Sequence, residues 1–169
     1  MTNTKNLRRE ILEKVREYYT QFAKETNKDF EQTVAKGAYI LMEEDKSRPI
    51  DITLIGTGSE LHLAKEVHET LTSEKFNKNV RTISMPCMDI FEAQDKAYKD
   101  SIVPKDGLIV SIEAATSFGW ERYTGRDGVN ISVDTFGKSE PMEDLQQDFG
   151  FTVDLVVEQI VSSMQASAS

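Results

Sequence analysis

Residues 51–60 read Asp-Ile-Thr-Leu-Ile-Gly-Thr-Gly-Ser-Glu, and this stretch decides the fold class. Its first five residues are rich in β-branched side chains, which favour a strand, and Gly56-Thr57-Gly58 ends that strand. Ser59 stands where a helix N-cap is expected, and the acidic Glu60 falls in the first turn, where the helix dipole favours it. Apolar residues at helical spacing follow, namely Leu61, Ala64, Val67 and Leu71. The segment predicts a strand that turns directly into a helix.

The same alternation of strands and helices extends toward both ends of the chain. Further strands are predicted at residues 38–42, 79–85, 107–112 and 129–133. Residues 88–103 predict one or two short helical turns, and Thr152 is expected to cap a last helix from Val153 to about Met164. The run at 107–112 is largely apolar, which is typical of a sheet covered on both faces. We therefore predict an α/β fold with a mostly parallel sheet between two layers of helices.

The first 32 residues have a different pattern. Leu7, Ile11, Val15, Tyr18 and Phe22 recur at steps of three and four residues, which predicts an amphipathic helix of about 18 residues. We place a boundary near residue 33, with this helix and its connector at 1–32 and the α/β domain at 33–169. The helix is expected to pack on the domain or on a second copy of the chain, covering apolar surface that would otherwise be exposed.

Composition and charge exclude several classes of partner. The 169 residues carry 20 Lys and Arg against 29 Asp and Glu, a formal net charge of −9, and the sequence pI is near 4.8. Such a chain repels phosphate at long range, so we expect neither a nucleic-acid partner nor an anionic membrane surface. No apolar run reaches the length of a membrane helix, and no secretory signal is visible. The single cysteine, Cys87, fits a reducing compartment, and we expect a cytoplasmic protein.

Two features could form a ligand site, and each has a simpler structural interpretation. The loop Gly56, Thr57, Gly58, Ser59, Glu60 could present backbone amides to an anion, but it lacks the lysine of a P-loop and the third glycine of a dinucleotide fingerprint. A tight structural turn is the favoured interpretation, because Glu60 would repel a phosphate. Glu113 ends the fourth predicted strand and Trp120 follows near the same edge, where α/β sheets gather ligands. For this pair an interface is favoured over catalysis.

The remaining reactive side chains predict no catalytic centre. His62 and His68 are the only histidines, and their spacing puts them roughly 240° apart around one helix, so they cannot share a metal. His62 is expected at the surface. Cys87 is expected to be a partly buried structural thiol, because no activating cation is near it in sequence.

Many short stretches, in order and in register, resemble the C-terminal domain of transketolase from about Thr33 to Met164. The matching stretches are Lys36–Leu41, Thr57–Glu60, Ser84–Pro86, Asp89, Phe91, Gln94-Asp95, Ala97-Tyr98, Glu113-Ala114, Thr135–Gly137, Ser139, Pro141 and Phe149–Val153. Departures from the usual pattern are Cys87, Ala115 and Lys138, where serine, glycine and an acidic residue are common.

The resemblance implies a three-layer α/β/α domain whose five-stranded mixed sheet has its first strand antiparallel to the others. It also implies an origin in thiamine-diphosphate enzymes of the pentose phosphate pathway, which move two-carbon ketol units between sugar phosphates. In that family the coenzyme, its divalent metal and the catalytic histidines belong to two preceding domains. The resemblance therefore assigns no catalytic, cofactor-binding or metal-binding residue to this chain.

Two functions follow as expectations. The first is a C-terminal domain or small subunit of a transketolase, inactive alone, that docks on thiamine-diphosphate-binding chains or domains or on a copy of itself. The second is a stand-alone module that binds a small anionic or sugar-phosphate ligand at the Gly56–Glu60 loop.

Overall fold

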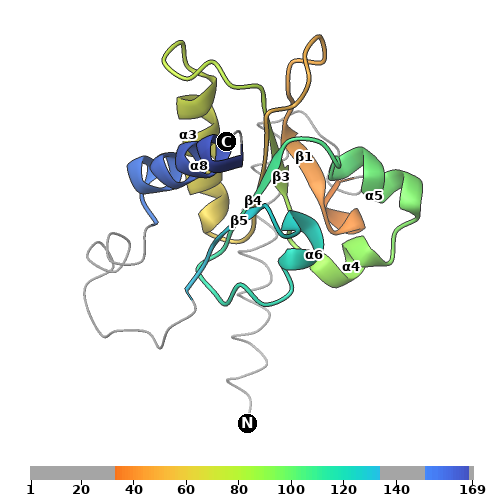
Figure 1. Cartoon of the computed structure of the whole chain (residues 1–169). Helices are drawn as coiled ribbons and strands as arrows, with labels where there is room; N and C mark the ends of the chain where they lie inside the picture. Colours follow the sequence, from red (N-terminus) through yellow and green to blue (C-terminus); the bar gives the residue numbers. More distant parts are fainter. Residues whose placement is uncertain (1–32, 134–150, 168–169) are drawn as a thin grey trace.

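The computed structural model describes residues 33–133 and 151–167, which form a five-stranded sheet flanked by helices (Figure 1). The strands are Tyr39–Met42 (β1), Ile52–Gly56 (β2), Val80–Ser84 (β3), Leu108–Ile112 (β4) and Val129–Ile131 (β5). Their order across the sheet is β1-β3-β2-β4-β5. The pairs β2–β3, β2–β4 and β4–β5 are parallel, whereas β1 runs antiparallel to β3. The expected mixed sheet with an antiparallel first strand is confirmed.

Helices cover both faces of this sheet (Figure 1). One layer consists of Glu60–Thr72 (α3) and Val153–Ser167 (α8). The other contains Met88–Glu92 (α4), Lys96–Ile102 (α5) and Glu121–Thr124 (α6). A 3-10 turn, Val34–Lys36 (η1), precedes β1. The three-layer α/β/α architecture is therefore as predicted, although the four-residue helix α6 was not foreseen.

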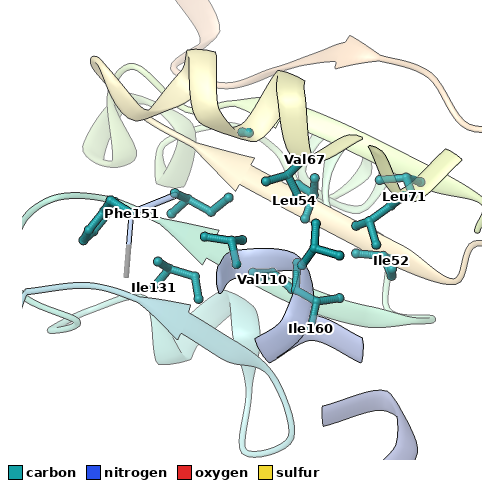
Figure 2. Close-up of a cluster of buried hydrophobic side chains, with 13 residues drawn as sticks. Ile52, Leu54, Val67, Leu71, Val110, Ile131, Phe151 and Ile160 are labelled. Atoms are coloured by element: carbon teal, nitrogen blue, oxygen red, sulfur yellow. The ribbon is translucent and has the colours of Figure 1, made fainter. Parts of the chain in front are cut away.

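The central strands are apolar because they have a core on each side. Ile52 and Leu54 face α3 and α8, while Ile55 faces the layer of short helices. The larger core, shown in Figure 2, comprises Ile52, Leu54, Ala64, Val67, Leu71, Val80, Val110, Ile112, Ile131, Phe151, Val156, Val157 and Ile160. Successive residues of a central strand are buried on opposite faces of the sheet, so neither face is exposed to water, as the continuous apolar runs predicted.

Gly56 allows α3 to pack closely on β2. A Cβ at this position would lie 3.0 Å from Ala64 Cβ and 3.2 Å from Leu61 Cα. These approaches are tighter than ordinary side-chain packing, so a larger residue would push the helix from the sheet.

The two predicted helix caps differ in outcome. Ser59 has helical backbone angles, φ −68° and ψ −29°, and its side chain accepts no hydrogen bond from the helix, so its predicted capping role is wrong. Thr152 does cap α8, because its Oγ1 accepts a hydrogen bond from Leu155 N at 3.4 Å. The predicted N-terminal helix and the matched residues 135–141 lie outside the described residues. The domain boundary near residue 33 stays a prediction.

Candidate functional site

Parallel strands bring the two predicted site features to one edge of the sheet. Gly56 is the residue of β2 that pairs with Ile112 of β4, so the loop after Gly56 and Glu113 both leave the sheet at its carboxyl end. Glu113 N donates a hydrogen bond to Ile131 O at 3.0 Å, which extends the pairing with β5 by one residue. The sequence therefore placed these residues correctly along the strands.

The Gly56–Glu60 loop forms a turn that uses its own polar groups. Ser59 Oγ donates a hydrogen bond to Glu60 Oε1 at 2.7 Å. The amide of Glu60 donates to Thr57 O, and the amide of His62 donates to Ser59 O. Gly58 has φ +56°, in the left-handed region that favours glycine. These contacts describe a tight turn with a carboxylate at the start of α3, and no described contact favours an anion there.

Glu113 and Trp120, which the sequence placed near one edge, bond directly to each other. Trp120 Nε1 donates to Glu113 Oε2 at 2.5 Å. The indole is 3% exposed and packs against Tyr123, with ring centroids 6.0 Å apart. A buried indole N–H needs an acceptor, and the carboxylate provides one. The pair thus closes the loop formed by residues 114–119 and ties it to the core.

Backbone contacts brace the same loop, which we call the edge loop (residues 114–119). Trp120 N donates to Ser117 O at 3.1 Å, and Val133 N donates to Ala115 O at 2.8 Å. Gly119 N donates to Glu121 Oε2 at 3.1 Å. The edge loop presents Phe118, which is 86% exposed. Phe118 was not predicted as a site residue, because an aromatic side chain two positions before Trp120 could equally be part of the core.

The histidines and the cysteine have structural surroundings. His62 is exposed and lies 3.3 Å from Glu66, while His68 is buried, with its Nδ1 2.9 Å from Thr82 Oγ1. Burial lowers the pKa of His68. Cys87 is half-buried, as expected. Within residues 33–133 and 151–167, no three His, Cys, Asp or Glu side chains converge as a metal site would require. With a carboxylate at the Gly56–Glu60 turn, these residues do not fit a diphosphate coenzyme and its metal.

A separate groove of about 1140 Å³ lies at the opposite, amino end of β2 and β4. At its wall Tyr123 donates its hydroxyl hydrogen to Glu92 Oε1 at 2.6 Å, and Lys99 Nζ lies 3.1 Å from Glu92 Oε2. The hydrogen bond from Tyr123 lowers the pKa of Glu92, and burial raises the pKa of Tyr123. The groove is lined by both cations and carboxylates, including Arg122 and Asp51, so its charge selects no class of ligand.

The described residues form a three-layer α/β/α domain. At the carboxyl end of its parallel strands lies the edge loop, with Phe118 exposed. Comparison with known proteins identifies its family. The family model of the transketolase-like C-terminal domain matches residues 37–152. The chain therefore belongs to the transketolase family and corresponds to its C-terminal domain.

Similar proteins are whole transketolases. The transketolase of Nostoc sp. is 45% identical over 125 residues, covering 73% of this chain and 18% of that protein. The chloroplastic transketolase-1 of Arabidopsis thaliana is 41% identical over 126 residues, covering 74% and 17%. The structure of transketolase from Leishmania mexicana superposes with a TM-score of 0.69 at 32% identity, covering 79% of this chain and 18% of that one. The chain thus spans less than a fifth of the length of these relatives.

One structural neighbour is described as an inactive β4 tetramer of a split-gene transketolase. It has a TM-score of 0.54 and 18% identity, covering 76% of this chain and 42% of that one. At this identity the likeness concerns the fold alone. No helix among the described residues has the length and apolar character needed to cross a bilayer.

Proposed function

We propose that this chain acts as the C-terminal domain or small subunit of a transketolase. In this role it contributes packing and subunit contacts to an enzyme that moves two-carbon ketol units between sugar phosphates. The observation that supports this proposal is the match of residues 37–152 to the family's C-terminal domain, together with relatives more than five times as long as the matched segment. The remaining four fifths of those relatives is where the catalytic groups are expected.

The chemistry of ketol transfer then belongs to the partner. Thiamine diphosphate, held with a divalent metal by the partner domains, supplies the carbanion chemistry of the reaction. In this chain Glu113 fixes Trp120 and, through it, the edge loop at the end of the sheet. The role of the domain is to position the partner domains by packing against them. We expect the isolated chain to show no turnover. We also propose that the protein is cytoplasmic and that two copies of the chain can contact each other as a homodimer.

The test is a reconstitution of activity. The Nostoc transketolase is shortened by the C-terminal segment that matches this chain and is assayed alone and with the full present chain. Xylulose 5-phosphate, the ligand named for a Pichia stipitis transketolase structure, serves as the ketol donor with an aldose phosphate as acceptor. We expect the mixture to show higher activity or a higher melting temperature than the shortened enzyme alone. Turnover by the present chain without a partner would contradict the proposal.

A further inference from the structure

A small apolar cluster lies where β1 forms the edge of the sheet. Tyr39 is 2% exposed and Leu41 is 6% exposed, and both pack with Leu61 at the start of α3. Val34 and Met42, both partly buried, pack against this group, which is distinct from the two larger cores. We call these five residues the β1 cluster.

The helices described on this face of the sheet do not extend over β1. Ile40 belongs to the core beneath the short helices, so its neighbours Tyr39 and Leu41 project to the face of α3 and α8. On that face α3 packs on β2 and β3, and α8 packs on α3 and β5 (Figure 1). Strands lie about 4.8 Å apart and packed helices about 8–10 Å apart, so these two helices leave the edge strand β1 beyond α3. Among the apolar side chains of α3 and α8, both fully described, only Leu61 belongs to the β1 cluster.

The flank of α3 that is turned to β1 is buried as well. His68 is 7% exposed, and its Nδ1 lies 2.9 Å from Oγ1 of Thr82. Thr82 is the residue of β3 that pairs with Met42 of β1, so this histidine marks the β1 side of the helix. Large side chains are thus withdrawn from water at the margin of the described helix layer. A fully buried side chain normally touches about six or more others, so a further segment beside α3 is indicated.

Residues 1–32 have the length, pattern and charge to cover this flank. Their predicted helix carries an apolar stripe from Leu7 to Phe22, about 22 Å long at 1.5 Å per residue, against about 20 Å for α3. The connector of ten residues that follows can span at most about 35 Å, so the helix can return alongside α3 from Val34, itself part of the β1 cluster. The segment contains seven basic and six acidic residues, whereas residues 33–169 have a net charge of −10, so the two attract each other.

We propose that the predicted amphipathic helix of residues 1–32 docks beside α3 and covers the β1 cluster with its apolar stripe. Residues 1–32 lie outside the segment that matches the family model, so the family assigns no such cover. The cover is independent of the proposed function. It closes the β1 edge of this face to partner domains, which then pack at another surface.

The first experiment uses the full chain with a photoreactive benzophenone amino acid in place of Val15 or of Thr20. Val15 lies in the apolar stripe, whereas Thr20 is about 140° away around the predicted helix and faces water. Light should link the Val15 variant to a peptide from β1 or α3 of the same chain, and the Thr20 variant to neither. Protein of mixed nitrogen isotopes identifies links between chains. No link from Val15, a link to other peptides only, or a link between two chains would each overturn the proposal, the last by placing a second copy on the β1 cluster.

Hydrogen exchange measures what the cover contributes, with Val15→Asn and Thr20→Asn as matched variants of the full chain. Both replace a β-branched residue by asparagine without a change of charge, so their effects on helix propensity are alike. Val15→Asn should speed exchange of the β1 amides about tenfold or more, whereas Thr20→Asn should change it less than about twofold. Exchange in β4 is the internal reference. Equal exchange of β1 in the wild type and Val15→Asn, or an equally large change in β4, would overturn the proposal.

Discussion

The hydrogen bond between Trp120 and Glu113 ties the edge loop to the core, and its removal has a cost that can be worked out. Trp120→Phe removes a hydrogen bond to a charged acceptor, worth about 1.5–3 kcal/mol. It also shrinks a side chain that is 3% exposed, and the space left behind adds about 1–2 kcal/mol. Glu113 is only half-buried and recovers some hydration, so the lower ends of these ranges apply. We expect a total loss of about 2.5 kcal/mol in the free energy of unfolding.

A double-mutant cycle separates the bond from the packing. Glu113→Ala leaves the buried indole N–H without an acceptor and should cost about 1.5 kcal/mol. Because both substitutions remove the same hydrogen bond, the double variant should cost about 2.5 kcal/mol rather than the sum of about 4 kcal/mol, a coupling of about 1.5 kcal/mol. Glu113→Gln is the matched control, since its amide oxygen can still accept from the indole, and its cost should stay below about 1 kcal/mol.

The assay is urea unfolding of the full chain followed by far-ultraviolet circular dichroism. Trp120 is the sole tryptophan, so its fluorescence reports independently on the site in the Glu113 variants. Glu113→Ala should shift the emission of the native state, and Glu113→Gln should shift it less. Costs that add to within about 0.5 kcal/mol would refute the reasoning, because they would show that the two side chains do not act together.

Four further predictions concern the scaffold. Arg81→Met should lower the free energy of unfolding in urea by about 3 kcal/mol or more, because it leaves the carboxylate of Glu44, whose side chain is 6% exposed, without its charged partner. Adding Glu44→Leu to the same chain should recover much of this loss. The hydrogen bond from Arg81 lowers the pKa of Glu44. The stability that this pair contributes should therefore be present above the ordinary carboxyl pKa and be lost as pH falls through the pKa of the folded state. A melting temperature that depends on pH equally strongly in Glu44→Gln would contradict this prediction. Gly37→Ala should destabilise far more than Gly125→Ala, since both have positive φ but a Cβ on Gly37 meets Phe91 N at 2.3 Å while Gly125 faces open space, and melting temperatures measure the difference. Burial lowers the pKa of His68 below 6.5, so its contribution to stability should be complete above that pH and be lost as pH falls through the lowered pKa, and His68→Gln should flatten this part of the stability profile.

Local sequence patterns were sufficient for most elements of the fold. The β-branched run before Gly56 predicted β2 to within one residue, and the helical spacing after it predicted a helix that begins at Glu60, as α3 does, because both signals are local. The antiparallel β1 came from the family resemblance, since a strand's direction depends on partners that local patterns do not specify. Ser59 shows the limit of the local rule: it has the side chain of a cap, but its backbone angles are already helical.

Contacts between distant residues were beyond sequence reasoning. Arg81 donates from Nε and an Nη atom to both carboxylate oxygens of Glu44, 37 residues away, and from its other Nη atom to the carbonyls of Ser101 and Ile102 at the end of α5. The one available signal was a charged residue within a strand that is otherwise buried. Such a residue must have a partner, but many carboxylates in this acidic chain could supply it.

The same limit applies to Phe118, the exposed aromatic residue of the edge loop. In Phe118-Gly119-Trp120, two aromatic residues stand two positions apart in a segment without regular periodicity, so sequence alone cannot tell which side chain enters the core. The indole N–H settles the choice, because Trp120 can be buried only where an acceptor such as Glu113 meets it, whereas Phe118 needs no polar partner and can remain in water at the loop tip. Glu113, at the end of β4, therefore determines which aromatic side chain is buried in the domain and which one stays exposed.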